Sequence, residues 1–392
     1  MHKATLETVY DKNIRIVAWG TYDLSKPRTR ILLRAIREAG VDIVECHQDV
    51  WGGVEDKSRI SGLVAVIRVF GRWLSSYPKL IWRYLRISRH DIVIVPYMGH
   101  LDILVIWPFA RLRRVPIVWD AFLSLYNTVV EDRELVHSRH PLALLLYIWE
   151  WLACHAADLV LVDTKAHAQY FVETFQICAE RIGSVFVGAE PEIFPATGNI
   201  EKDIKNSEST TTILFYGQFI PLHGILTIIE AARLAKDLPI RWIIVGRGQE
   251  AASVQRLLNS DPIPSLTWVP WVPYDQLVEI ICNADICLGI FGTSRKAGMV
   301  IPNKVFQILS TGAPLITRDS PAIRELLDPS MPGVFLIPPG DPKCLVGAIN
   351  EFRLRKTYLL TRPLHEAVRQ TIHPGSIGRN LMSHLSRIHV GV

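Results

Sequence analysis

Basic side chains gather in one glycine-containing stretch of the chain, ICLGIFGTSRKAGMVIPNKVFQILSTGAPLIT at residues 286–317. The pattern predicts a strand, a loop that holds Arg295 and Lys296, a helix over 303–309 and a second strand. A proline precedes the helix and a glycine follows it, as is usual at helix ends. Backbone N–H groups at such a helix start, together with Lys304 and the two loop cations, suit a phosphorylated ligand. The alternative is an ordinary crossover with a solvated basic loop.

Titratable side chains also accompany two apolar runs in the first half of the chain, at 91–96 and 116–120. His100 and Asp102 follow the first run, and Asp120 ends the second. Because the carboxyl ends of parallel strands line a cleft, a general acid, a general base or a substrate-orienting group is expected among them. Asp120 and His100 are the catalytic candidates. For His100 the alternative is a structural histidine that is hydrogen-bonded inside the fold.

A third apolar run, at 14–19, leads to Asp23, Arg28 and Arg30. The same strand-end argument places these side chains near the cleft. The alternative for both arginines is a solvated position at the start of the helix predicted over 29–39. The loop after this run has one glycine and no GxGxxG, so a dinucleotide-binding fingerprint is absent.

Length and composition indicate a soluble protein with two cores. The chain has 392 residues, too many for one typical core, and 49% of them are hydrophobic, which argues against disorder. The six cysteines form no CxxC pair, so neither a zinc site nor a disulfide framework is indicated and a reducing cytosol is the expected setting. The first residues lack an apolar signal core, and no apolar run reaches the roughly 18 residues that span a bilayer.

Apolar runs and helical patterns alternate along the whole chain, which predicts α/β architecture with doubly wound parallel sheets. The polar stretch GNIEKDIKNSESTTT at 198–212 predicts a boundary. We therefore expect two tandem Rossmann-like domains, 1–197 and 198–371, with a cleft between them. The last segment, 372–392, is expected to form a helix that crosses back to the first domain.

The basic residues are unevenly distributed. Residues 59–114 hold ten arginines and lysines against two aspartates, a net charge of +8, whereas the whole chain carries +5. Within 59–89, basic and aromatic residues alternate without any acid, a composition suited to an anionic membrane surface. Nucleic acid is not expected as a partner, because no recognisable binding module surrounds the segment. The local alternative is a crossover helix with a basic outer face.

The second half carries five motifs in a fixed order: FYGQFIPLHG at 215–224, IIVGRGQ at 243–249, VPYDQL at 272–277, ADICLGIF at 284–291 and IPNKVFQILSTGAPLIT at 301–317. This ordered set resembles the GT-B-fold glycosyltransferases of family 4, and the resemblance covers most of the chain. It implies transfer of a sugar, with retention, from a nucleotide-sugar donor in the second domain to an acceptor in the first. It also implies no metal and no cofactor beyond the donor substrate, and the chain has no DxD motif.

The resemblance also assigns residues. Those implied to bind the donor are Gly217, Gln218, His223, Gly224, Gly246, Arg247, Arg295, Lys296, Asn303, Lys304 and Gln307. Asp23 and Arg28 would bind the acceptor. The sequence departs from the family twice: Gln218 and His223 stand where the family has an arginine and a lysine, and Met299 and Gln307 stand where it has two glutamates. Lys304, Arg295, Lys296 and Arg247 would then carry more of the positive charge.

The predicted function is a metal-independent glycosyltransferase that acts on a glycan, lipid-linked or other hydroxyl acceptor in polysaccharide or glycolipid assembly. It is expected in the cytoplasm, peripherally bound to the inner face of the membrane through 59–89. Two alternatives stay open from the residues alone. The missing cations and carboxylates would suit a non-catalytic GT-B protein that binds a lipid or partner, and the same fold would suit a nucleotide-sugar epimerase.

Overall fold

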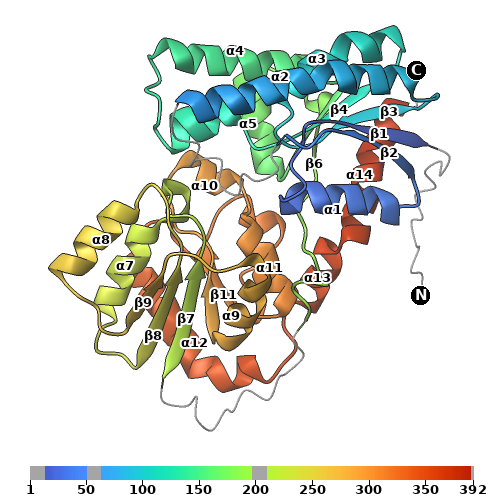
Figure 1. Ribbon diagram of the computed structural model, residues 1–392. Coiled ribbons are helices and arrows are strands. Elements are labelled where there is room, and N and C mark those ends of the chain that lie inside the picture. Colours follow the sequence, from blue (N-terminus) through green and yellow to red (C-terminus); the bar gives the residue numbers. More distant parts are fainter. Residues whose placement is uncertain (1–13, 51–62, 197–209, 390–392) are drawn as a thin grey trace, which may run out of the picture.

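The computed structural model describes residues 14–50, 63–196 and 210–389, and it forms two α/β units (Figure 1). The expected boundary at 198–212 falls almost entirely outside these residues, as does the start of the basic segment 59–89. Within the described ranges, no helix is both long and apolar enough to cross a bilayer.

The first unit is a six-stranded parallel sheet in the order β2-β1-β3-β4-β5-β6. Its strands are β1 (Arg15–Gly20), β2 (Asp42–His47), β3 (Ile92–Val95), β4 (Ile117–Phe122), β5 (Leu159–Val162) and β6 (Ile182–Ser184). Its helices are α1 (Pro27–Glu38), α2 (Leu63–Arg86), α3 (His100–Leu112), the π-helix η2 (Asn127–Asp132), α4 (Pro141–Ala156), α5 (Lys165–Phe175) and the 3₁₀ turn η3 (Ala179–Arg181). Inner strands such as IVIV of β3 are buried on both faces, as parallel sheets require.

The second unit is a parallel sheet in the order β12-β11-β10-β7-β8-β9, the Rossmann order. Its strands are β7 (Thr211–Tyr216), β8 (Ile240–Val245), β9 (Leu266–Val269), β10 (Ile286–Leu288), β11 (Leu315–Arg318) and β12 (Val334–Ile337). Its helices and turns are η4 (Pro221–His223), α7 (Ile225–Leu234), α8 (Ala251–Ser260), η5 (Tyr274–Gln276), α9 (Leu277–Asn283), α10 (Arg295–Met299), α11 (Asn303–Thr311), η6 (Ile323–Glu325), α12 (Pro342–Leu360) and α13 (Glu366–Ile372). The predicted pair of doubly wound parallel sheets is confirmed.

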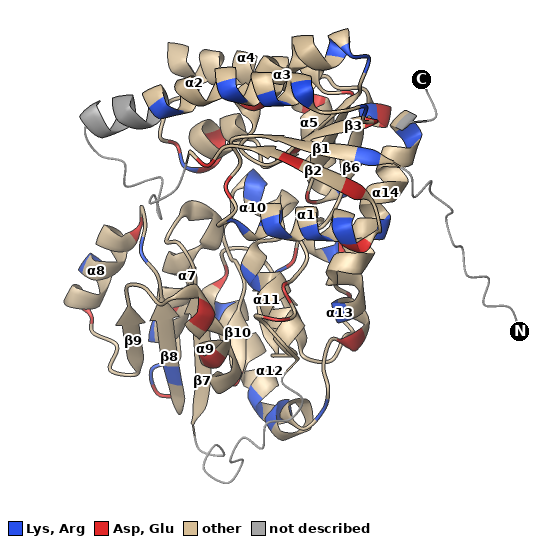
Figure 2. Ribbon diagram, turned by 45° about the vertical axis from the view of Figure 1, so that its right-hand side comes forward, with Lys and Arg blue, Asp and Glu red and all other residues tan. Residues whose placement is uncertain are grey.

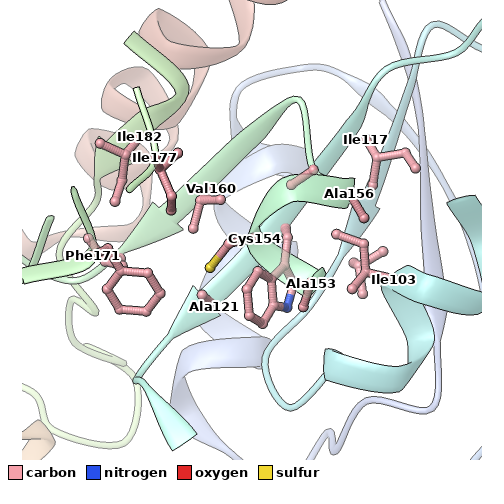
Figure 3. Packing of buried hydrophobic residues seen from close by; sticks show 14 of the residues in the cluster. Ile103, Ile117, Ala121, Ala153, Cys154, Ala156, Val160, Phe171, Ile177 and Ile182 are labelled. Carbon is pink, nitrogen blue, oxygen red and sulfur yellow. The ribbon is translucent and has the colours of Figure 1, made fainter. Parts of the chain in front are cut away.

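Apolar packing covers both faces of the first sheet. Helices α2 to α5 bury one face, and Figure 3 shows part of that cluster, where Ile103 of α3 and Cys154 of α4 pack with Ile117 and Val160 of the sheet. Helix α1 covers the opposite face together with the final helix α14 (Pro374–His389), which lies beside it. The C-terminal segment therefore contributes to the core of the first unit.

One local prediction from the sequence was wrong. The basic loop before α11 contains the short helix α10, which the Ser294 side chain caps by accepting from the Ala297 N–H at 3.2 Å.

Helix α14 approaches α1 closely where Gly378 faces Ala35. A Cβ added at Gly378 would overlap the Ala35 carbonyl oxygen and lie 3.1 Å from its carbon, so backbone would have to move. We expect Gly378→Ala to lower the free energy of unfolding by about 1–3 kcal/mol, as overpacking does. Gly347→Ala is the control, because Gly347 of α12 faces open space and its alanine should gain about 1 kcal/mol of helix propensity. Equal effects in urea denaturation would contradict this packing.

Candidate active site

The site lies where the second sheet reverses its strand order, between β7 and β10. Ligands of open α/β sheets bind beyond the carboxyl ends of the strands at this switch point. Lys304 of α11 reaches the switch point: its Nζ donates to the Gly289 carbonyl at 3.3 Å and sits 3.8 Å from the centre of the Phe215 ring. Gly217 leaves room for it, since a Cβ there would lie 2.9 Å from the Lys304 Nζ.

Lys304 is a buried cation without an acidic partner among the described side chains. Lys304 is only 5% exposed, and burial lowers the pKa of its ammonium group well below the usual value for lysine. Holding an ammonium group in such a place costs free energy unless an anion joins it. The position is therefore prepared for a negatively charged ligand.

His223 lies beside Lys304 and is neutral. Its Nδ1 hydrogen-bonds with the Gln218 carbonyl, and because a carbonyl only accepts, Nδ1 carries the proton and donates. Burial lowers the pKa of His223 well below its usual value, and the Lys304 charge lowers it further. His223 therefore adds no fixed positive charge to the free protein, although it stands where the family resemblance places a lysine.

A second cation comes from the first unit. Arg133, which follows η2, donates through Nη2 to the Gln218 side-chain oxygen at 3.3 Å, and its backbone carbonyl accepts from Gln249 Nε2 at 3.0 Å. Arg133 thus sits against Gln218, the position at which the resemblance implies an arginine. Arg133 of the first unit therefore supplies the positive charge that the turn after β7 lacks.

Two adjoining cavities share Arg133, Tyr216, Gly217 and Gln218 as common walls. One cavity of about 550 Å³ lies between the units, and Lys304 and Thr128 stand on opposite sides of it. The other, of about 750 Å³, lies over the strand ends of β7, β8 and β9. Their sizes fall in the range of small-molecule sites. Arg133 lines both cavities, and Lys304 lines the first one.

The second cavity has an aromatic wall that sequence reasoning missed. Trp271 is 53% exposed and lines this cavity with Gly246 and Arg247. It follows β9, so the strand-end rule applied to 116–120 would have found it. An exposed indole beside an arginine suits stacking against a planar ring. Gly246 itself is required by close packing, because a Cβ there would overlap the Gly217 carbonyl oxygen.

Helix α11 adds neutral polar groups to the first cavity. Gln307 accepts from the Tyr216 hydroxyl at 3.0 Å and donates to the Tyr274 hydroxyl at 3.1 Å, so its amide is held on both sides. Asn303 lines the same cavity, and its buried side-chain oxygen has no partner within the described structure. Met299 is buried against the core of the first unit. At the two positions where the family has glutamates, the cavity therefore has the amide of Gln307, while the Met299 side chain is in the core.

Arg295 and Lys296 point to the first unit. Arg295 forms an ion pair with Glu173 of α5 at 2.6 Å and does not line either cavity. Lys296 is buried, lines the first cavity and bonds to the Thr128 hydroxyl of η2. Burial lowers the pKa of Lys296 to about 8, and Asp132 opposes that shift. Helix α10 therefore connects the units, and only Lys296 of its two cations faces the ligand space.

Two carboxylates line the first cavity, Asp132 and Asp163. Asp163 is held by His167 at 2.7 Å and by the Ile301 N–H at 3.4 Å. Asp132 accepts from the Ser294 hydroxyl at 2.6 Å through one oxygen, while its other oxygen is buried without a partner in the described structure. Asp132 is thus the carboxylate of this cavity that has a bonding position left.

The π-helix η2 carries Asp132 and Thr128 into the cavity, and a buried glutamate holds its start. The Glu150 carboxylate accepts from the N–H groups of Leu125 and Tyr126 at 2.9 and 2.8 Å. His100 Nε2 lies 3.6 Å from the same carboxylate, behind the helix and away from the cavity. π-Helices occur often at functional sites. His100, a predicted catalytic residue, supports this loop in the structure and has no access to a ligand there.

Asp120, the other predicted catalytic residue, is fully buried beneath the cavity. It accepts from Arg28 Nη2 at 2.7 Å and Nε at 3.1 Å, and Arg28 also donates to the Val185 and Phe186 carbonyls at 2.6 and 3.1 Å. Burial raises the pKa of Asp120, and the Arg28 charge counteracts it. The pair joins α1 to the sheet. Arg28 borders the cavity, but its bonds are directed into the protein.

Two further predicted residues lie at the margin of the site. Asp23 is buried in the turn before α1, where it accepts from the Ser25 N–H at 2.8 Å, and it is not part of the cavity wall. Gly224 serves packing: a Cβ there would lie 2.6 Å from the Gly292 N, where the turn η4 contacts the loop after β10. Within the described ranges, no group of three or more histidine, cysteine or acidic side chains is arranged to hold a metal ion.

Residues 210–353 match the family model described as "Glycosyl transferases group 1". We call this matched part of the chain, residues 210–353, the group 1 domain. Over 289 residues the chain is 25% identical to the chitobiosyldiphosphodolichol beta-mannosyltransferase of Eremothecium gossypii, spanning 67% of this chain and 59% of that relative. Its fold is similar to sucrose-phosphate synthase from Thermosynechococcus elongatus, with a TM-score of 0.70 at 13% identity, covering 97% of this chain and 100% of that one.

The fold is also similar to that of HepE from Anabaena, whose structure was determined with UDP-glucose. That match has a TM-score of 0.61 at 13% identity and covers 96% of this chain and 99% of the other. The chain therefore has the GT-B fold, and residues 210–353 contain the switch point, Lys304 and the shared cavity walls Tyr216, Gly217 and Gln218. Arg133 lies outside that domain, which explains why the motifs of 210–353 did not reveal it.

The burial of Lys304 predicts a conflict between stability and ligand binding. Replacing it by methionine keeps the length and removes a desolvated charge that has no acidic partner in the group 1 domain. We expect Lys304→Met to raise the free energy of unfolding by about 1 kcal/mol in urea denaturation. Lys343→Met, at an exposed position of α12, is the control and should change it by less than about 0.5 kcal/mol. A clear loss of stability would mean that Lys304 serves the fold instead.

Proposed function

We propose that the protein transfers a sugar from a nucleotide-sugar donor to a hydroxyl group of an acceptor. The observation that carries the proposal is the buried ammonium group of Lys304, which has no acidic partner among the residues that the structure describes and lies at the switch point of the group 1 domain. A nucleoside diphosphate is a ligand whose negative charge matches that position. The first cavity would then hold the sugar, and the groove beside Trp271 would hold the nucleoside.

In this proposal the protein stabilises the leaving group. When the bond between the sugar and the diphosphate breaks, negative charge grows on the departing oxygen, and fixed positive groups lower the barrier. Arg133 is the cation that lines both cavities, Lys304 lines the first one, and the start of α11 adds N–H groups. These residues would meet the diphosphate charge without a metal ion, as the family resemblance implies.

The acceptor would enter from the first unit, whose side of the cavity carries Asp132, Thr128 and Lys26. The name of one relative describes a dolichol diphosphate-linked acceptor and mannosyl transfer. Applied to this chain, that name supports a hexosyl donor and a lipid-linked or glycan acceptor. Asp132 is placed to accept a hydrogen bond from the attacking hydroxyl, because one of its oxygens has no protein partner in the described structure.

We include retention of configuration in the proposal, as the resemblance implies. Front-face attack lets the departing phosphate oxygen take the acceptor proton, so a protein carboxylate only has to orient the hydroxyl. Inverting attack from the opposite face would need a general base, and Asp132 is the group that could take that part. Asp132 would therefore orient the hydroxyl in the retaining route and act as the general base in the inverting route.

Proton uptake tests the donor site. A diphosphate next to Lys304 favours its charged form, so ligand binding should raise its depressed pKa and draw a proton from solution. We expect calorimetry with UDP or GDP in buffers of different ionisation enthalpy to show proton uptake at a pH high enough for the nucleotide itself to be fully deprotonated. Affinity should fall with rising pH because the pKa of Lys304 is higher in the complex than in the free protein.

Lys304→Met should abolish most of this proton uptake and weaken nucleotide binding by about tenfold to hundredfold, the value of a charge-assisted hydrogen bond. Lys343→Met is the control and should bind as the natural chain does. No binding of any nucleoside diphosphate would contradict the donor site. Binding that is unchanged in Lys304→Met would remove the observation on which the proposal rests.

Asp132→Asn tests the chemical step. If the departing oxygen accepts the proton, we expect kcat to fall by about tenfold, since the amide still contacts the hydroxyl, and the product to keep the donor configuration. A loss of about a thousandfold, with an inverted product, would contradict retention and identify a general base. Kinetics with the product's anomeric configuration from NMR distinguish these outcomes. Asp275→Asn, at an exposed position, is the control.

The same assays separate the alternative functions. A nucleotide-sugar epimerase would convert the donor without any acceptor, and a non-catalytic GT-B protein would bind without turnover. Neither alternative predicts that a hydroxyl acceptor accelerates release of the nucleoside diphosphate. Acceptor-dependent release is therefore the decisive measurement for transfer.

A further inference from the structure

Helix α4 has an apolar surface where a helix of a soluble protein normally carries charge. Its outward residues are large and exposed: Leu144 is 61% and Leu145 60% exposed, and Leu142, Ile148 and Leu152 follow at helical spacing. The only acidic residue of the helix, Glu150, is fully buried beneath it. The exposed side of α4 therefore consists mainly of leucine and isoleucine from Leu142 to Leu152.

The apolar surface continues over the two neighbouring helices. Helix α3 packs against both α4 and α2, and the three together cover one face of the first sheet. Trp107 and Leu112 of α3 and Trp82 and Leu85 of α2 are exposed on them. We call the exposed side of α2, α3 and α4 the outer helical face. More than half of the large apolar side chains exposed in the described structure lie on it.

Charge on the outer helical face has one sign. The exposed charged residues of α2 and α3 are all basic: Arg72, Lys79, Arg83, Arg86 and Arg111. The single acid within these helices, Asp102 of α3, is buried, where it accepts from Tyr77 at 2.6 Å. Figure 2 shows basic residues recurring along the upper helices. Arg86 stacks over the Trp82 ring at 3.6 Å, so a cation and an amphipathic ring lie together at the surface.

We propose that the outer helical face binds a lipid bilayer whose headgroups are anionic. Leucine and isoleucine of α4 enter the acyl boundary, while the arginines and Lys79 of α2 contact phosphate groups at the rim. The sequence alone had assigned membrane contact to 59–89. The structure supports different roles for the two helices. Helix α2 supplies the charge, and α4 supplies most of the apolar area that would enter the bilayer.

Charge complementarity favours a bilayer over a second copy of the chain. Two copies that met through this face would bring like-charged arginines of both α2 helices toward each other, and no exposed acid of α2 to α4 in the described structure would neutralise them. An anionic bilayer offers acyl chains to the apolar residues of α4 and phosphate groups to the basic residues of α2. A second copy remains an outcome that the experiment can detect.

The outer helical face is connected to the active site by a short loop. Residues 133–140 join η2, which lines the first cavity, to the start of α4, and Arg133 and Leu135 of this loop line the second cavity. The bilayer would thus lie next to the cleft on the acceptor side. This part of the inference rests on the proposed function: a lipid-linked acceptor would reach Asp132 without leaving the membrane.

Vesicle flotation without any nucleotide tests the inference separately from catalysis. The full chain is mixed with phosphatidylcholine vesicles that contain or lack phosphatidylglycerol, at low and high salt. We expect binding to the anionic vesicles, weakened by salt. Leu145→Glu/Ile148→Glu should reduce the bound fraction by about tenfold, because charged groups cannot enter the acyl boundary. Lys79→Glu/Arg86→Glu should weaken binding to anionic vesicles and remove much of the salt dependence.

Matched controls lie on the second unit. Leu354 is 89% exposed on α12, so Leu354→Glu removes an equally exposed leucine away from the outer helical face and should bind as the natural chain does. Unchanged melting temperatures and UDP binding show that the α4 variant is folded. The proposal is overturned if the natural chain does not float, or if the α4 variant floats equally well. It is also overturned if sedimentation shows a dimer that the α4 variant dissociates while vesicle binding is absent.

Discussion

The active site depends on one unfavourable placement, the buried ammonium group of Lys304 at the switch point of the second sheet. Nothing acidic in the described structure compensates it, and the surrounding features follow from that charge. Gly217 leaves space for the Nζ, the Gly289 carbonyl accepts a hydrogen bond from it, and the Phe215 ring lies against it. His223 is kept neutral partly by the same charge. The result is a site that has already desolvated its cation before a ligand arrives, so a bound anion gains the interaction without that cost.

The second constraint is that the site is divided between two units. Arg133 reaches Gln218 from the first unit, and Lys296 reaches Thr128 from the second. Below them, a chain of hydrogen bonds runs from Tyr216 through Gln307 and Tyr274 to Glu190, which pairs with Arg30 of α1 at 2.7 Å. Any movement between the units changes these contacts together. Arg133 therefore brings its charge to Gln218 through the contact between the two units.

The sequence predicted the parts of the molecule that depend on local pattern. Both doubly wound sheets and the helix that carries Lys304 and Gln307 follow from apolar runs and from proline and glycine at helix ends. The pairing of Arg28 with Asp120 was not predictable, because the residues are 92 positions apart and only the fold joins them. Asp132 was missed because a π-helix has no 3.6-residue period.

The first unit combines three features that could have been separate. The outer helical face, the π-helix with Asp132 and the cation of Arg133 all belong to it and are joined through α4 and the short loop before it. Glu150 connects them directly, because it lies on the buried side of α4 and accepts hydrogen bonds from two backbone N–H groups at the start of η2. If the outer helical face binds a bilayer as proposed, Asp132 is connected to that bilayer through α4 and Glu150. The group 1 domain, which carries Lys304 and would bind the donor in the proposed function, lines the other side of the first cavity.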